Sequence, residues 1–222
     1  MQTFATPAPV SVVLDIPAGR IQLIAADRPD TTVEIRPADA AKNRDTKAAE
    51  RIDVAYDGEV LRIGAQEAAN RLLGHTGAVE ITVRLPAGSH VEAKAADAEL
   101  RGVGRLGDVT YDGARSTVKL DEAATARLTV QAGDITLGRL TGPAEISTRK
   151  GDIRVTEAAR GTVTLRTDLG DIAVGTPRGT SASLDAGTAH GRITNSLTNT
   201  EGDAAVTFHA TTAHGDITAR SL

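Results

Sequence analysis

The fold is decided by the stretch Leu128–Leu137, which reads Leu-Thr-Val-Gln-Ala-Gly-Asp-Ile-Thr-Leu. On both sides of its Gly-Asp pair, aliphatic residues alternate with Thr or Gln, so each half predicts a β-strand with one apolar face. Gly133 permits a backbone angle that other residues resist, and Asp134 can accept hydrogen bonds from N–H groups around the bend. The stretch therefore predicts two short strands that meet at a corner and direct their aliphatic side chains into one interior.

The same unit recurs through the second half of the chain, once with Arg in place of Asp. The copies are Gly107-Asp108-Val109, Gly133-Asp134-Ile135, Gly151-Asp152-Ile153, Gly170-Asp171-Ile172, Gly191-Arg192-Ile193 and Gly215-Asp216-Ile217. Their glycines are 26, 18, 19, 21 and 24 residues apart. A period near twenty in an all-strand pattern is typical of a solenoid, in which each turn buries its apolar face against its neighbours. We predict an all-β protein whose residues 89–222 form a β-solenoid, similar to a single-stranded β-helix of either hand.

The alternation also predicts the interior of this solenoid. Stacked turns lie about 4.8 Å apart, so each aliphatic side chain packs on its counterpart in the next turn. A narrow interior of this kind has little room for rings, which would explain why the chain holds only Phe4, Tyr56, Tyr111 and Phe208. The residues expected inside are Leu128, Val130, Ile135, Leu137, Ile153, Val155, Ile172 and Val174.

The first part of the chain predicts a separate strand-rich region. A corner of sequence Pro-Ala-Gly occurs twice, at residues 17–19 and 86–88, and the second copy marks the expected boundary. We therefore divide the chain into an N-terminal capping region, residues 1–88, and the solenoid, residues 89–222. Polar residues 38–50 predict a loop or about two turns of helix, and residues 65–77 predict a loop. The expected strands are Val10–Ile16, Arg20–Ala25, Thr32–Arg36, Ile52–Tyr56, Val60–Ile63 and Val79–Leu85.

The Leu-Pro-Ala-Gly corner at residues 85–88, the Gly-Asp-Ile/Val repeats and the closing His-Gly-Asp-Ile-Thr-Ala at residues 214–219 resemble the DUF4097 family. This is a group of bacterial β-strand-repeat proteins loosely labelled adhesin-like. The resemblance covers most of the chain and implies a β-solenoid. It implies no activity and no catalytic residues, because the family has none established.

Composition excludes several classes of function. The 222 residues include no Cys, so disulfides and thiolate metal sites are absent. The net charge of -4 comes from interspersed residues with no basic stripe, and the few aromatic rings offer no stacking platform, so we expect no nucleic-acid partner. No apolar run reaches the roughly 18 residues of a membrane span, and the N-terminus lacks the basic and apolar regions of a signal peptide. We therefore expect a cytoplasmic protein with no membrane partner.

Two columns of side chains are candidate metal sites. The Asp column could bind calcium as a ladder, but calcium β-rolls repeat every nine residues with further glycines, so we expect these aspartates to form corners. His190 and His214 occupy equivalent places before a Gly and could bind a transition metal, but two ligands do not complete a site. His75, in a polar loop, is expected to face solvent. We predict no metal site and no cofactor.

A catalytic site is not expected either. No Gly-x-Ser-x-Gly elbow supports a nucleophile triad. A glycosidase or lyase could use Asp134, Asp152 and Asp171 as acid and base, yet these fit a corner role. The segment Lys42–Arg51 alternates charge and is expected to be a solvated face, with a partner surface as the alternative.

The sequence therefore favours a non-enzymatic scaffold or protein-interaction module. A self-assembling structural protein, either cytoskeleton-like or adhesin-like, is the alternative, and a carbohydrate-active β-helix enzyme is the third possibility. An uncovered last turn favours a homodimer through the C-terminal turns. If Phe208 closes that end alone, the protein is a monomer.

Overall fold

The computed structural model describes residues 1–65, 77–199 and 204–222. The described residues form sixteen strands in one open sheet and one short helix. No helix in these ranges is long and apolar enough to cross a membrane. The elements are β1 Gln2–Ala5, β2 Ser11–Ala26, β3 Asp30–Pro37, α1 Asn43–Glu50, β4 Ile52–Tyr56, β5 Val60–Ala65, β6 Val79–Pro86, β7 His90–Ala132, β8 Ile135–Leu140, β9 Ala144–Lys150, β10 Ile153–Ala158, β11 Gly161–Leu169, β12 Ile172–Thr176, β13 Ala182–His190, β14 Ile193–Ser196, β15 Val206–His214 and β16 Ile217–Ser221.

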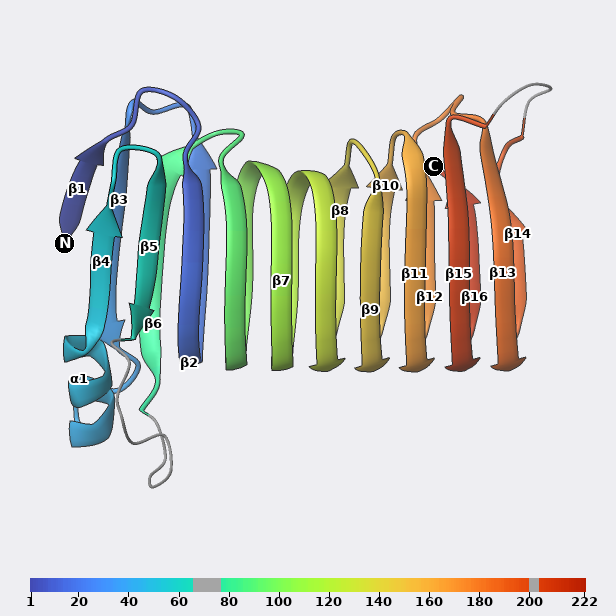
Figure 1. Ribbon diagram of the computed structural model, residues 1–222. Coiled ribbons are helices and arrows are strands. Elements are labelled where there is room, and N and C mark those ends of the chain that lie inside the picture. The colour runs from blue at the N-terminus through green and yellow to red at the C-terminus, as the bar shows by residue number, and fades with distance from the viewer. Residues whose placement is uncertain (66–76, 200–203) are drawn as a thin grey trace.

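Two layers of parallel strands run along the molecule (Figure 1). We call β9, β11, β15 and β13 the first sheet, and β8, β10, β12, β16 and β14 the second sheet. The long strand β7 winds around several corners and pairs with both β8 and β9, so it joins these two layers into one continuous hydrogen-bonded sheet. Equivalent residues stack in register, as in the isoleucine column of the second sheet: Ile135, Ile153, Ile172, Ile217 and Ile193. The arrangement fits a solenoid.

The interior lies between the two layers. The eight aliphatic residues expected there are all buried, with at most 3% of each side chain exposed, so this prediction is confirmed. Their burial follows from the alternation along each strand, because alternate side chains of a strand point to opposite faces.

The expectation about rings is wrong, because two rings lie inside the stack. Phe208 and Tyr111 are 0% and 1% exposed. Phe208 packs between neighbouring strands, opposite Val163 on one side and Leu184 on the other. In the same turn, Ala219 stands where the preceding turn has Val174. The smaller alanine leaves volume that a ring can fill.

The last two turns are stacked in the reverse of their order along the chain. β15 pairs with β11 on one side and with β13 on the other, and β16 lies in the same way between β12 and β14. The chain therefore builds the terminal turn, β13–β14, before it returns to fill the place beneath it (Figure 1). Phe208 is not at the end of the stack, so the alternative in which Phe208 alone closes the last turn is wrong.

The N-terminal end has a different construction. β2 makes a turn of its own, and its two halves pair in parallel with β7 on one side and with β5 and β6 on the other. β5 and β6 are then covered by antiparallel β4 and β3, and β3 by β1. The helix α1 packs against β3 and β6. The division at residues 88 and 89 stays a prediction, because parallel pairing continues across it.

The strands expected in this region are present with small changes in their bounds. Val10–Ile16 and Arg20–Ala25 join into the single strand β2, which bends at the Pro-Ala-Gly corner, where Gly19 has a φ of 135°. The polar segment 38–50 includes the helix α1. The loop expected at 65–77 lies almost entirely outside the described residues, and His75 lies there too.

Candidate functional site

One edge of the stack is formed by a tight bend that recurs in five turns, which we call the glycine corner. A Cβ atom at Gly151 would lie 2.2 Å from the carbonyl oxygen of Gly133, and one at Gly170 would lie 2.0 Å from that of Gly151. Their φ angles of 142° and 151° are also unfavourable for residues with side chains. Glycine is thus required by close approach of the turns. The glycines of this corner are, in spatial order, Gly133, Gly151, Gly170, Gly215 and Gly191.

The aspartates that follow these glycines form a continuous hydrogen-bond ladder. The N–H of Asp152 donates to Oδ1 of Asp134 at 2.9 Å, and the N–H of Asp171 donates to Oδ1 of Asp152 at 2.8 Å. Asp171 and Asp216 continue the series, the distance being 2.7 Å. Each carboxylate therefore satisfies a backbone donor of the next turn, which is a structural role.

Arg192 ends this ladder in the terminal turn. Its N–H donates to Oδ1 of Asp216 at 2.9 Å, and its guanidinium contacts Oδ2 at 2.9 Å. Both interactions hold the pKa of Asp216 below its ordinary value, the backbone hydrogen bond being the larger cause. Among the described residues, no further turn supplies an N–H here, so an aspartate at position 192 would lack this donor.

A threonine column supports the same corner and was missed by the sequence reasoning. The hydroxyl groups of Thr167, Thr212 and Thr188 donate to carbonyl oxygens of Gly151, Gly170 and Gly215, each at 3.0 Å. The signal was available, because Thr precedes each of the last four corner glycines by three residues.

Gly107-Asp108 does not belong to this corner, which corrects the sequence analysis. Its glycine N–H donates to the carbonyl of Ser89, and the N–H of Asp108 donates to Nδ1 of His90 at 3.2 Å. These contacts place the pair at the opposite bend of the stack. The equivalent of Gly133 in the preceding turn is Ser116, whose carbonyl faces it. The 26 residues from Gly107 to Gly133 therefore cover about half a turn, from the opposite bend to Ser116, and then one full turn from Ser116 to Gly133.

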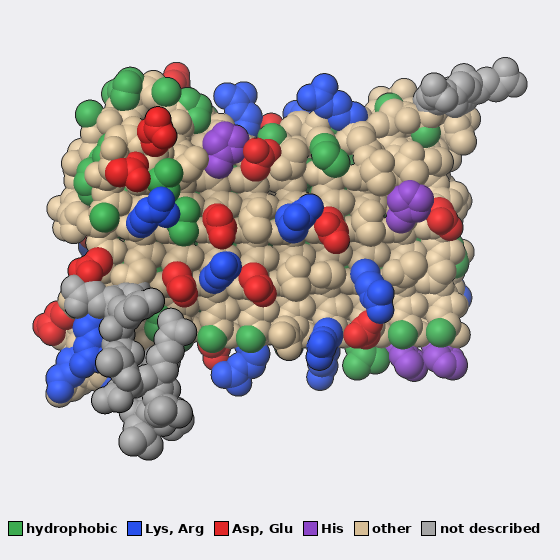
Figure 2. Space-filling view, in the orientation of Figure 1, with side chains coloured by type: hydrophobic (Ala, Val, Ile, Leu, Met, Phe, Trp, Pro, Cys, Tyr) green, Lys and Arg blue, Asp and Glu red, His purple; other side chains and the backbone are tan. Residues whose placement is uncertain are grey.

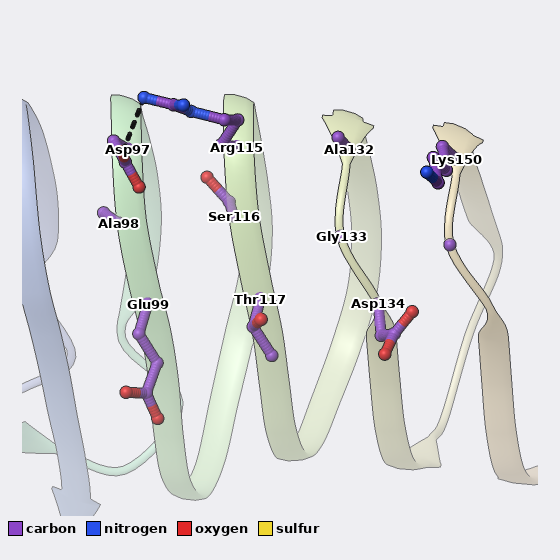
Figure 3. A pocket seen from close by; sticks show the side chains of 11 residues that line it. Asp97, Ala98, Glu99, Arg115, Ser116, Thr117, Ala132, Gly133, Asp134 and Lys150 are labelled. Carbon is purple, nitrogen blue, oxygen red and sulfur yellow. Dashed lines mark hydrogen bonds and ion pairs between the residues drawn. The ribbon is translucent and has the colours of Figure 1, made fainter.

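An open groove of about 620 Å³ lies along this edge, over the turns of Ala98 and Ser116 and the first two glycine corners, at Gly133 and Gly151 (Figure 3). Charged side chains of both signs line it from successive turns: Asp97, Glu99, Arg115, Asp134 and Lys150. Arg115 forms an ion pair with Asp97 at 2.8 Å. Figure 3 shows that residues of successive turns fall into rows, so the fold fixes the order of charges along the groove.

His190 and His214 lie in adjacent turns, and their rings stack on each other. The rings of His190 and His214 are 4.7 Å apart and nearly parallel, at 23°. They lie at the exposed edge next to Leu169, whose side chain is 48% exposed. Among the described residues, no group of three or more His, Asp or Glu is placed to hold a metal ion.

The candidate acid and base residues are held by the ladder. Oδ1 of Asp134, of Asp152 and of Asp171 each accepts a backbone N–H. The segment Lys42–Arg51 contains α1, in which Asp45 is buried and accepts the N–H of Ala78 at 3.1 Å. This carboxylate fixes the helix to the chain that enters β6.

The outer face of the first sheet is flat and carries interspersed charges (Figure 2). Arg127 lies 3.5 Å from Glu145, and Nδ1 of His209 lies 3.3 Å from Asp185. Pairs of opposite charge in adjacent turns compensate each other on this face.

The in-register strands and their closing Gly-Asp-Ile-Thr-Ala agree with a match to a family profile. The DUF4097 profile, described as Toastrack, matches residues 90–220. The chain belongs to the DUF4097 family. No curated protein matches the sequence.

Solved structures from Bacteroides fragilis, Parabacteroides distasonis and Clostridium sporogenes are similar to this chain at low sequence identity. A "putative adhesin" of Bacteroides fragilis is 14% identical, covers 98% of this chain and 95% of its own, and has a TM-score of 0.48. A "putative lipid binding protein" of Parabacteroides distasonis is 11% identical with the same coverage and a TM-score of 0.43. A "putative cell adhesion protein" of Clostridium sporogenes is 10% identical, covers 100% and 98%, and has a TM-score of 0.40. Scores below 0.5 place no constraint on this chain's function.

Proposed function

We propose that this protein is a non-enzymatic, cytoplasmic β-solenoid scaffold of Gly-Asp repeats that binds a protein partner. The observation that carries the proposal is the open groove at the glycine corner, where successive turns present charges of both signs in fixed order. The interior beneath it is made of buried aliphatic residues, so the backbone positions that carry these charges are fixed before a partner binds.

The chemistry of the groove favours a protein over a small molecule. Small-molecule sites are concave and largely enclosed. This groove is open, and Arg115 and Asp97 pair across adjacent turns at its rim. Charges of both signs on an open rim suit the polar periphery of a protein interface and give specificity through complementary charges.

The proposal is tested by reversing two basic charges of the groove, Arg115→Glu and Lys150→Glu together. The matched control is Arg139→Glu, since Arg139 is also exposed and ion-paired, to Glu157 at 3.4 Å, but does not line the groove. Exposed ion pairs contribute about 0–1 kcal/mol, so all variants should fold.

Tagged proteins would be expressed in the native host and recovered with quantitative mass spectrometry. We expect a partner that is enriched with the wild type and the control and lost by at least tenfold with the double variant. Equal recovery by all three proteins, or turnover of a carbohydrate by the purified wild type, would contradict the proposal.

We also propose self-association as a homodimer through the C-terminal turns, with no nucleic-acid or membrane partner. This proposal is supported by the end of the stack formed by β13 and β14, because no described strand covers it.

A further inference from the structure

The two ends of the stack differ in how their edges are covered. At the N-terminal end, the parallel strands are followed by antiparallel β3 and β4, and the outermost strand β1 is only four residues long. At the other end, within the described residues, β13 pairs only with β15 and β14 only with β16. On the free side of β13, the N–H of Ala182 donates to the carbonyl of Thr198. Beyond that contact, no described strand pairs with the free sides of β13 and β14, which leaves backbone N–H and C=O groups available there.

Apolar side chains are uncovered at this same end. Ile193 is 46% exposed, whereas Ile217 in the adjacent turn is 0% exposed. Leu184 and Ala186 of β13 are also only partly buried, although Phe208, the neighbour of Leu184, is fully enclosed. The end of the stack thus has the side-chain pattern of a turn that lacks its next neighbour.

The usual protection of an edge strand is missing here. Neither β13 nor β14 contains Lys or Pro. The only acidic residue of β13 is Asp185, which faces His209, and Arg192 at the corner is bound to Asp216. β14 itself contains no charged residue, so a β13 strand that meets it opposes no like charge.

Symmetry favours a second copy as the occupant. β13 and β14 run in opposite directions (Figure 1), so a two-fold axis parallel to the strands sets β13 of each copy antiparallel to β14 of the other. The nine residues of β13 are about 30 Å long and the four residues of β14 about 13 Å, so with a width of about 10 Å for each layer one copy offers roughly 430 Å². The total of roughly 860 Å² corresponds to a weak dimer.

We propose that a second copy of this chain binds edge to edge at β13–β14 and forms a closed, two-fold dimer. This proposal deepens the self-association given under the proposed function and rests on it. Open filaments are disfavoured, because head-to-tail stacking would need the N-terminal end, which β1, β3 and β4 cover.

The test is sedimentation of the purified full chain between about 1 and 100 μM, a range that resolves micromolar dissociation constants. Ile193→Lys places a charge on the free end, and its matched control is Leu169→Lys, because Leu169 is equally exposed but lies at the glycine corner. A second variant, Ala186→Pro, removes a backbone N–H that could pair with the second copy. The N–H of Val206 in β15 donates to the carbonyl of Ser181, so the odd-numbered residues of β13 direct their backbone groups toward β15. The even-numbered residues, including Ala186, direct their N–H groups toward the free side.

We expect the wild type and Leu169→Lys to form dimers, and Ile193→Lys and Ala186→Pro to dissociate at least tenfold more readily, with circular dichroism confirming that each is folded. A wild type that is monomeric throughout, a dimer indifferent to both edge variants, or an open-ended series of oligomers would overturn the proposal. The groove variants should leave the dimer unchanged. Failure of the dimer is thus distinguishable from failure of partner binding.

Discussion

Leu137 and Ile153 are fully enclosed, whereas His190 is exposed at the glycine corner. We predict that Leu137→Ala or Ile153→Ala lowers the free energy of unfolding by about 2–5 kcal/mol, as truncation of buried aliphatic residues does. His190→Ala should cost less than about 1 kcal/mol, because few packing contacts are lost at an exposed site. Denaturant unfolding measures both. The reverse order would mean that the histidine stack is structural or carries a ligand.

A second residue-scale prediction concerns acid. The pKa of Asp216 lies below its ordinary value of 3.8 because it accepts the N–H of Arg192 and pairs with its guanidinium. A lowered folded pKa stabilises the folded state above the unfolded value, and this contribution is lost as the pH falls from near 3.8 through the folded pKa. Asp216→Asn should therefore show a flatter decline of Tm below about pH 4. Parallel declines for wild type and variant would contradict this.

At the scale of the corner element, two glycines form a matched pair. A Cβ at Gly151 would meet the backbone of Gly133, whereas one at Gly187 would meet nothing within 4 Å. We predict that Gly151→Ala destabilises by about 2–4 kcal/mol through positive φ and crowding. Gly187→Ala should be nearly neutral. Thermal melts compare the two, and similar losses would show that close approach does not set the corner.

The corner also shows how far the sequence can be interpreted. The alternation in Leu128–Leu137 is local, so it predicted the buried residues correctly. Gly107-Asp108 carries the same local chemistry at the other bend, and only pairing with the next turn distinguishes the two. Ser116 forms the true corner there without a glycine. Its Oγ accepts a hydrogen bond from the buried Tyr111 hydroxyl at 2.8 Å, a contact that no repeat pattern predicts.

For the whole molecule, the order of the last turns could not be predicted from the repeat period. Residues 182–196 and 206–221 have nearly the same pattern, so chain order alone suggests that they stack in sequence. Weak signals of a terminal turn do exist. Asn195 stands where the adjacent turn has Ala219, and Arg192 replaces the aspartate that a following turn would engage.

The groove and the free edge belong to this same scale. Both arise from positions that are distant along the chain, such as Asp97 and Lys150, and that become neighbours only through stacking. The sequence therefore predicted a free end in the C-terminal turns, but neither that β13–β14 is the last turn nor where the groove lies. The free edge depends entirely on β13–β14 being the last turn, and so does the proposed dimer.

The reversed order of these turns is tested most directly by engineered disulfides, since the chain has no native Cys. Thr164 is the in-register partner of His209, and His209 in turn of Asp185, so Thr164 and Asp185 are two turns apart. A disulfide requires Cα atoms within about 7 Å. We predict that Thr164→Cys with His209→Cys crosslinks on mild oxidation, whereas Thr164→Cys with Asp185→Cys does not. Rapid crosslinking of the second pair and none of the first would show that the turns follow chain order and would contradict the account.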